Sequence, residues 1–233
     1  MIFKLTRHKI CNILNTFASR WARRDKVYIP YASEKLLKQL ASISRKIQKK
    51  GLPKNLVIKK LKNNLGHGIF LHPKAEPIAR GDAIAFYAGE VSIVPQLDDS
   101  SSDYVFSLFT DLRLNCEEQK LFDPKNRFHP RRLYSIDLDA DRIGNFTRFI
   151  NHSEEPNLEA TLFRIAANPY GLRPSPFEII YHARKTIRPG EQLLICYEGE
   201  DKSYWGVTNT TPFPMTPQTF KLDLSLKVCY TTN

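Results

Sequence analysis

The chain has 233 residues, of which 42% are hydrophobic and 25% charged, and its formal net charge is +11. This composition is typical of a globular protein and excludes an intrinsically disordered one. The apolar runs are only a few residues long, whereas a membrane-spanning helix needs roughly 20, so an integral membrane protein is excluded. We expect no secretory signal, because the N-terminus has no apolar block followed by a small-residue cleavage site.

The spacing of the cysteines argues against both zinc and disulfide bonds. The chain has four cysteines, and no two of them have the C-x-x-C spacing of a zinc site. The six histidines are equally scattered. We therefore expect a reducing compartment, no disulfide framework and no bound metal.

The charge is distributed unevenly. Residues 1–62 contain 17 Lys and Arg but only two acids, whereas the other 171 residues contain 18 basic and 22 acidic residues. Such a division indicates two functional parts. The basic part has two interpretations that stay open: a surface that binds a polyanion such as nucleic acid, or a solvated face that aids solubility. The acidic remainder would attract a lysine-rich protein.

The first expected element is a helix over residues 33–50. Ser33 suits the N-cap, and Gly51 suits the cap that ends the helix. The apolar positions follow the helical repeat, and lysines and arginines lie opposite them. This helix packs either on the rest of the chain or on a second subunit, as in a homodimer. The apolar residues of its stripe are Leu36, Leu40, Ile43 and Ile47, and a less regular helix is expected upstream, around Ile10, Ile13, Leu14 and Phe17.

After about residue 65 the pattern changes to short runs of aromatic and branched residues separated by turn residues. Strands do not alternate with long helices, which argues against a doubly wound α/β fold. Three prolines from residue 207 onward predict an irregular tail. The expected strands are 83–87, 104–109, 133–136, 158–165, 177–182 and 192–196.

Four segments carry candidate chemistry. Residues 65–70 read LGHGIF, in which two glycines allow a tight turn and a close approach to a ligand. Residues 86–90 read FYAGE, and alone they indicate only a strand that ends in a turn. Residues 144–153 read GNFTRFINHS and are followed by Pro156 and Asn157. Asn, His and Ser lie close together there, but the segment has no nucleophile elbow, which argues against a hydrolase. Residues 183–197 read ARKTIRPGEQLLICY, a turn followed by a strand that ends in a tyrosine.

In this order and spacing, the four segments resemble the SET domain of protein lysine methyltransferases, from about Leu65 to Trp205. The small size and the lack of zinc-binding cysteines look most like the short SET proteins of bacteria, such as those of chlamydiae. The resemblance implies a mainly β fold, a β-clip with a pseudo-knot, to which a basic N-terminal helical segment is added, α+β overall. The implied parts are a basic segment 1–62, a SET domain 63–206 and a tail 207–233.

The resemblance also implies the activity, which is transfer of a methyl group from S-adenosyl-L-methionine to a lysine of a basic, histone-like protein of chromatin. Tyr197 would be the catalytic tyrosine, and Tyr104 would assist it. The implied cofactor-binding residues are Gly66, His67, Gly68, Arg148, Asn151, His152 and Trp205, and the implied substrate channel is formed by Tyr87, Ile195 and Tyr104. No metal is implied.

The sequence departs from the family pattern at three points. Cys196 stands where an acidic residue usually precedes the tyrosine, and Ile195 stands where Phe or Tyr is frequent, so the number of methyl groups added is open. The cysteine-rich segment that completes many SET sites is absent. Trp205, beside Tyr204, would then close the cofactor pocket by stacking on adenine, or would simply pack in the core.

A second function from another class is a catalytically inactive SET-fold module that residues 1–62 tether to DNA or chromatin. Residues 1–62 are the expected nucleic-acid contact in either case, and no membrane partner is expected. The expected location is the cytoplasm of a bacterium or, after export, the nucleus of a host.

Overall fold

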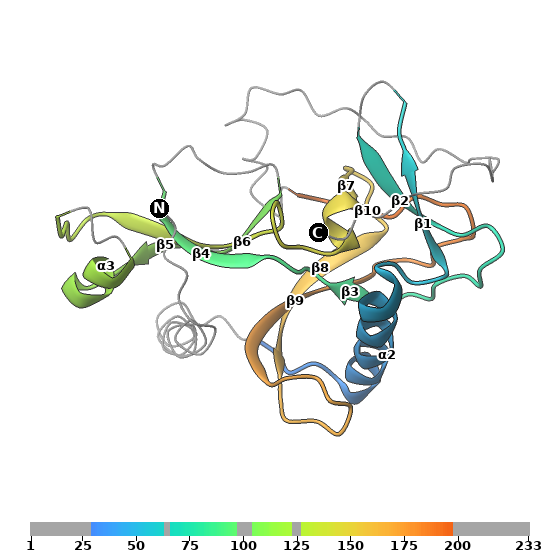
Figure 1. Cartoon of the computed structure of the whole chain (residues 1–233), viewed down its shortest axis with the longest axis horizontal. Helices are drawn as coiled ribbons and strands as arrows, with labels where there is room; N and C mark the ends of the chain where they lie inside the picture. The colour runs from blue at the N-terminus through green and yellow to red at the C-terminus, as the bar shows by residue number, and fades with distance from the viewer. Residues whose placement is uncertain (1–28, 63–65, 97–103, 123–126, 198–233) are drawn as a thin grey trace. The chain divides into compact units, whose positions relative to one another are not determined.

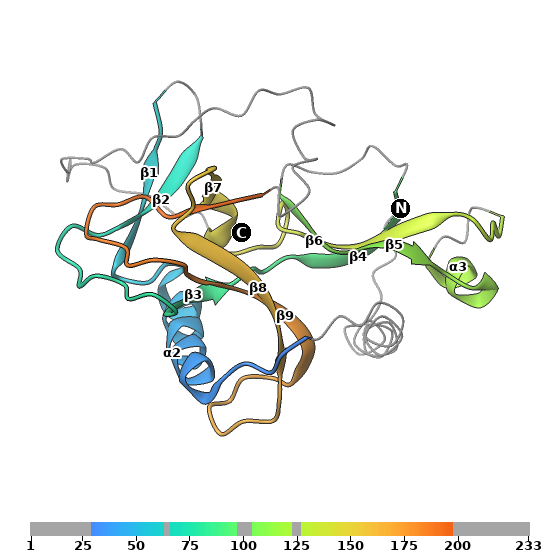
Figure 2. The same cartoon turned by 180° about the vertical axis from the view of Figure 1, so that it is seen from behind.

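The computed structural model describes residues 29–62, 66–96, 104–122 and 127–197 (Figure 1; the reverse view is Figure 2). Most of the regular structure in these ranges is short β-strands, so the expected mainly β fold with few helices is confirmed. The helices are α2 (Glu34–Lys50), α3 (Cys116–Phe122) and the 3-10 helix η1 (Phe146–Phe149). The strands are β1 (Leu56–Lys60), β2 (His67–Leu71), β3 (Ala83–Phe86), β4 (Glu90–Pro95), β5 (Val105–Arg113), β6 (Leu133–Asp139), β7 (Asn151–His152), β8 (Leu158–Ile165), β9 (Ser175–Ala183) and β10 (Leu194–Ile195).

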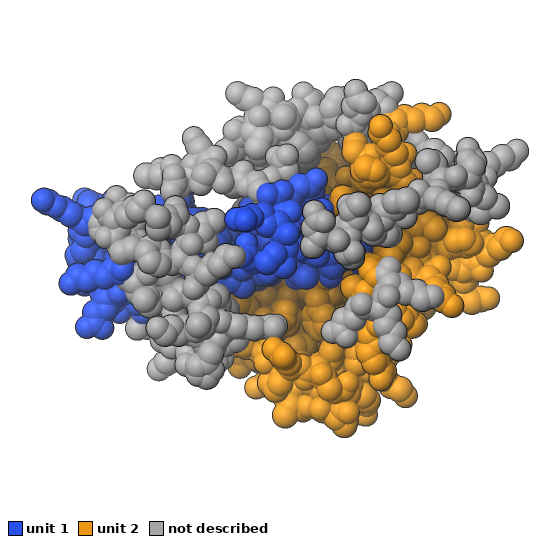
Figure 3. Space-filling model, in the orientation of Figure 1, with its two compact units in different colours: residues 1–29, 87–148 blue, residues 30–86, 149–233 orange. Residues whose placement is uncertain are grey.

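The chain divides into two compact units, coloured separately in Figure 3. Unit 1 comprises residues 1–29 and 87–148, and unit 2 comprises residues 30–86 and 149–233. The described residues of unit 1 thus come almost entirely from the part of the chain between the FYAGE segment and the RFINHS residues 148–153.

Unit 1 is built on an antiparallel sheet of three strands in the order β4-β6-β5. Successive residues of the central strand β6 alternate between the two faces of the sheet. Tyr134 and Ile136 are fully buried on one face, while Ser135 and Asp137 lie on the other. The apolar face supplies the core of this unit.

Gly89, in the FYAGE segment, permits the close pairing of β4 with β6. A Cβ atom at this position would lie 2.8 Å from both the backbone carbon and the backbone oxygen of Asp139. Backbone atoms cannot move aside without disturbing the sheet, so only glycine fits here. The segment that the sequence presented as a strand ending in a turn is thus also the start of β4.

Unit 2 contains helix α2 and a second antiparallel sheet, in the order β3-β9-β8. The predicted caps of α2 are confirmed: the Ser33 hydroxyl accepts from Leu36 N–H at 3.3 Å, and Gly51 N–H donates to Ile47 O at 2.7 Å. Figure 1 shows α2 lying beside β3 and β9.

The apolar stripe of α2 is buried against this sheet, which decides one of the alternatives left by the sequence: the helix packs on its own chain. Leu40 is fully buried and packs with Ile180 of β9. Polar contacts fix the helix further, because the Gln39 side chain bonds both Asp82 (2.8 Å) and Ala83 N–H (3.1 Å). The buried cluster comprises Ala32, Leu36, Leu37, Leu40, Ala83, Ile165 and Ile180.

Strands β1 and β2 form an antiparallel hairpin in unit 2. The sharp change in charge at residue 62 therefore falls in the connection between two paired strands. Neither strand was predicted: the lysines of β1 obscure its alternation, and the glycines of the G-x-G segment indicated a turn rather than the start of β2.

The predicted strands agree with the structure in position, and the run 158–165 coincides with β8. Strand β4 and helix α3 were not predicted. The helix expected around residues 10–17 and the tail from 207 lie outside the described residues. Within the described ranges, no helix combines the length and the apolar character that a membrane crossing requires.

Candidate active site

The short parallel pair of β7 with β10 brings together two of the segments singled out in the sequence. Asn151 lies opposite Leu194, and His152 lies opposite Ile195. Ser153 N–H extends the ladder by donating to Ile195 O at 2.9 Å. Residues 148–153, the RFINHS part of the motif, therefore meet the segment that ends in Tyr197.

Asn157 fastens these two segments together. Its side-chain amide donates to Gln192 O at 2.7 Å, its side-chain oxygen accepts from Leu194 N–H at 2.8 Å, and its own N–H donates to Leu194 O at 3.2 Å. Because Asn157 is buried, these bonds replace solvent that it cannot reach. Asn157 belongs to the motif seen in the sequence, but the sequence alone assigned it no role.

Tyr197 follows β10 by two positions and is 42% exposed to solvent. Its hydroxyl donates to Ile150 O at 2.6 Å, which fixes the direction of the O–H bond. Its backbone N–H donates to His152 Nδ1 at 3.0 Å, and the two rings lie 5.4 Å apart between centroids. Both ends of the tyrosine are therefore anchored to the RFINHS segment.

The side chain of His152 has a positioning role. Because Nδ1 accepts a hydrogen bond from Tyr197, the ring proton of the neutral imidazole lies on Nε2. The residue is buried. The sequence placed His152 among the cofactor-binding residues but did not reveal this contact of its side chain with Tyr197.

The G-x-G segment lies against Asn151. Asn151 Nδ2 donates to His67 O at 2.9 Å, and the His67 ring meets the Phe149 ring edge-on at 5.9 Å. The predicted cofactor-binding residues Gly66, His67, Gly68, Asn151 and His152 are thus neighbours in unit 2. Their grouping agrees with the sequence prediction, and their binding role stays a prediction.

Gly68 offers a test of whether this place suits the cofactor that the resemblance implies. A Cβ atom there would lie 2.7 Å from Gln192 Nε2 and 3.3 Å from Asn151 Nδ2, so two amide groups converge on bare backbone. Gln192 Nε2 is buried and has no hydrogen-bond partner among the described residues. The Asn151 amide already donates to His67 O and Phe149 O, whereas the unsatisfied Gln192 amide lies beside the buried backbone of Gly68. An unsatisfied amide donor suits a group rich in acceptors, such as the carboxylate of S-adenosylmethionine. The residues present fit it.

Three further predicted residues belong to unit 1 and contact each other there. The Tyr87 hydroxyl donates to Tyr104 O at 2.6 Å. The Arg148 guanidinium lies over the Tyr104 ring at 5.5 Å and donates to the carbonyls of Ala140 (2.9 Å) and Asp141 (2.8 Å). These contacts order the loop before η1. The roles of Tyr87, Tyr104 and Arg148 toward cofactor and substrate stay predictions.

The remaining residues singled out in the sequence lie in or after β10. Ile195 is buried in β10, and Cys196 is half-buried with a free thiol. Trp205 lies outside the described residues. Within the described ranges, no group of three His, Cys, Asp or Glu side chains is arranged to hold a metal ion.

Comparison with known proteins gives two relatives among characterised sequences. One is SET domain-containing protein 4 of Saccharomyces cerevisiae, 24% identical over 67% of this chain and 26% of the yeast protein. The other is the histone-lysine N-methyltransferase SUVH1 of Nicotiana tabacum, H3 lysine-9 specific, 29% identical over 55% of this chain and 17% of the tobacco protein. The chain thus matches only about a quarter or less of either relative.

Solved structures also match, with low overall superposition. KRYPTONITE in complex with mCHH DNA, an H3(1-15) peptide and SAH has a TM-score of 0.40 and 25% identity, and covers 63% of this chain and 24% of that chain. The methyltransferase domain of human SETMAR has a TM-score of 0.41 and 24% identity, and covers 65% of this chain and 47% of that chain. The family model of the SET domain matches residues 16–198 of the present chain. The chain therefore belongs to the SET domain family.

Proposed function

We propose that this chain is an S-adenosylmethionine-dependent protein-lysine N-methyltransferase that acts on a basic, histone-like protein. The observation that carries the proposal is the double anchoring of Tyr197, through its hydroxyl to Ile150 and through its backbone to His152. A tyrosine held at both ends on a partly exposed strand end is prepared to orient a reacting group.

Cofactor binding is assigned to the segment around Gly68. The buried amide of Gln192, beside the backbone of Gly68, would donate to the carboxylate of the cofactor, and the side-chain oxygen of Asn151 would accept from its amino group. When bound, S-adenosylmethionine would supply a methyl group for transfer to a neutral lysine amine, with its positively charged sulfur as the leaving group. Asn151 would act twice, since its bond to His67 O also keeps the G-x-G segment in place.

The Tyr197 hydroxyl suits the positive charge of this reaction. Its proton is directed to Ile150 O, so its oxygen presents acceptor lone pairs on the other side. Such a fixed dipole favours a cationic reacting group without reorganisation during the reaction. Desolvation beside aromatic rings would also lower the pKa of the incoming lysine and favour its reactive neutral form.

A lysine-rich substrate agrees with the charge of the chain after residue 62, where acids exceed bases by four. A negative field would raise the rate of encounter with a basic protein. The name of the tobacco relative, a histone-lysine N-methyltransferase, supports the same substrate class.

The alternative function, an inactive binding module, would need none of these contacts. A module without chemistry has no use for a buried His152 side chain that positions Tyr197, or for an Asn151 amide that holds the G-x-G segment. Their joint presence favours the enzyme.

The test is transfer of labelled methyl from S-adenosylmethionine to a mixture of histones and bacterial histone-like proteins. We expect label on lysine for the wild type, and a large loss of turnover in Tyr197→Phe with cofactor affinity nearly unchanged by calorimetry. Tyr170→Phe is the matched control, because it also removes a hydroxyl that donates a hydrogen bond, here to Glu34 at 2.7 Å. No label together with no cofactor binding would refute the proposal and favour the inactive module.

A further inference from the structure

A basic surface of unit 2 lies on the opposite side of α2 from the buried stripe. Residues 34–62 contain nine lysines, one arginine and a single acid, Glu34. Glu34 accepts a hydrogen bond from Tyr170. Most of the basic side chains are exposed. We define the basic face as the exposed residues Lys35, Lys38, Arg45, Lys46, Lys54, Lys60 and Lys62.

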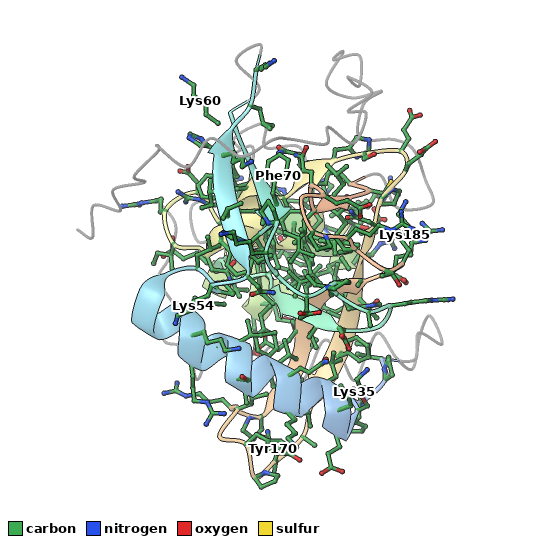
Figure 4. All side chains as sticks on the ribbon, turned by 90° about the vertical axis from the view of Figure 1, so that its right-hand side faces the viewer. Lys35, Lys54, Lys60, Phe70, Tyr170 and Lys185 are labelled. Carbon is green, nitrogen blue, oxygen red and sulfur yellow. The ribbon has the colours of Figure 1, made fainter. Side chains whose placement is uncertain are left out.

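The basic residues of α2 form one stripe along the helix. At about 100° per residue, Lys35, Lys38, Arg45 and Lys46 fall within an arc of about 100°, and the leucines that pack on the sheet lie opposite. Figure 4 shows Lys35 near one end of α2, Lys54 beyond the other end, and Lys60 on the β1 side. The packing of the helix therefore fixes these charges outward, as an array on a rigid element.

Neighbouring acids neutralise little of this array. Lys35 pairs with Asp82 at 2.9 Å, and Glu34 lies one turn before Lys38. From Lys35 to Lys50 the helix contains no acid. Like charges close together repel one another, and a bound polyanion would relieve this repulsion. Binding would also release the counterions of the polyanion, which favours the complex.

The dimensions and composition of the face indicate which polyanion fits. A helix of 17 residues is about 25 Å long, which corresponds to about seven steps of a duplex at 3.4 Å each. The exposed residues of the described part of α2 include no aromatic side chain for stacking single-stranded bases, and no large apolar side chain for insertion into a membrane. The face thus suits the phosphates of a duplex.

We propose that the basic face binds the phosphate backbone of double-stranded nucleic acid, without reading its sequence. The expectation that residues 1–62 contact nucleic acid thereby narrows to α2 and the start of the β1–β2 hairpin. This inference is independent of methyl transfer: it assigns a docking surface that would serve the enzyme and the inactive module equally.

The test compares two triple variants of the full chain with equal charge loss. Lys38→Gln/Arg45→Gln/Lys46→Gln removes three charges from the basic face and keeps good helix formers. Arg184→Gln/Lys185→Gln/Arg188→Gln removes three exposed charges from another part of unit 2, where Lys185 is labelled in Figure 4. Binding to a labelled 30-base-pair DNA duplex is measured by anisotropy between 50 and 200 mM salt, with circular dichroism to verify folding.

We expect micromolar binding of the wild type, and a slope of log affinity against log salt that falls by about one for each basic residue lost from the face. The second variant should bind like the wild type. Equal binding by both variants, or no binding by the wild type at 50 mM salt, would overturn the proposal. A 30-base-pair RNA duplex that binds equally would support phosphate recognition, whereas preference for single-stranded DNA or for phosphatidylserine vesicles would overturn it.

Discussion

The Nδ1 atom of His152 accepts a hydrogen bond from the backbone N–H of Tyr197 across 45 residues of sequence, at 3.0 Å. This bond joins the last residue of β7 to the residue that follows β10 by two positions. The imidazole thus holds the tyrosine backbone in place, and a neutral ring that accepts at Nδ1 carries its proton at Nε2. The placement of Tyr197 thus depends on a side chain outside its own strand.

The first prediction concerns this hydrogen bond between His152 and Tyr197. His152→Ala should lower methyl transfer and destabilise the fold by about 1–3 kcal/mol, because the partly buried Tyr197 N–H loses its partner and the buried His152 ring is removed. His152→Asn should retain more of both, since the Asn Oδ1 atom can accept in a similar position. Turnover and denaturant unfolding of the two variants provide the comparison. Equal losses in both would show that the volume of the ring, and not its acceptor, matters.

The second prediction compares two of the motif glycines that have close neighbours, Gly68 and Gly89. Gly89→Ala would place a Cβ atom 2.8 Å from the Asp139 backbone, whereas Gly68→Ala would meet the end of the Gln192 side chain at 2.7 Å. We expect Gly89→Ala to cost about 3 kcal/mol or more and Gly68→Ala about 1–3 kcal/mol, because a side chain can move and a sheet backbone cannot. Urea unfolding measures both.

A double variant supplies the control for Gly68. In the Gln192→Ala background the main obstacle to a Cβ atom is gone, so Gly68→Ala should cost clearly less than in the wild type. Additive costs would mean that Leu61 and Asn151, at 3.2 and 3.3 Å, set the limit instead.

Much of the site could be predicted from the sequence because each of its residues stands in a short, recognisable motif. Asn151 and His152 stand in one motif and Tyr197 in another, and the pairing of β7 with β10 brings the two motifs together. What could not be predicted is which atoms touch. Two examples are the hydrogen bond from Tyr197 N–H to the His152 ring and the hydrogen bond from Leu194 N–H to the Asn157 side chain. Both depend on the directions of side chains, which the pattern of apolar and polar residues does not predict.

The fold shows the same division. The helix α2 was predictable because its apolar repeat, its N-cap and its final glycine agree. Strand β1 was not predictable, because two of its five residues are the lysines Lys59 and Lys60, which have low strand propensity. This segment forms a strand because it pairs with β2. Tertiary pairing overrides local propensity most readily in such short strands.

The third prediction tests whether α2 belongs to the folded core. Leu40→Ala should cost about 2–5 kcal/mol, because Leu40 is fully buried against Ile180 and truncation leaves a cavity. Lys38→Ala, on the exposed side of the same helix, should change the free energy of unfolding by less than about 0.5 kcal/mol. Thermal and urea unfolding give both values. If Leu40→Ala were as mild as Lys38→Ala, the helix would be an appendage to the domain.

The fourth prediction concerns the pH dependence of stability. Burial of the Asp137 carboxyl raises its pKa, against hydrogen bonds from Ser107 and Ser135 that lower it, and nearby Asp139 adds to the rise. Above about pH 4 the unfolded chain loses this proton while the folded protein keeps it, so stability falls as pH rises toward the folded pKa. The side chain of Asp137→Asn stays neutral at every pH. The free energy of unfolding of this variant should therefore increase relative to that of the wild type as pH rises through this window.

Asp82 supplies a control of opposite sign. Partial burial raises its pKa, but hydrogen bonds from Gln39 and Lys35 and the charge of Lys35 outweigh burial, so the net pKa is lowered. Its contribution to stability is present above the unfolded pKa and is lost as pH falls through the folded pKa. Asp82→Asn should therefore be at its greatest disadvantage near neutral pH and approach the wild type in acid. Urea unfolding between pH 3 and 7 would show the Asp137→Asn and Asp82→Asn differences diverging with pH, and parallel curves would contradict the assignment of Asp137 as a buried carboxyl whose ionisation opposes folding.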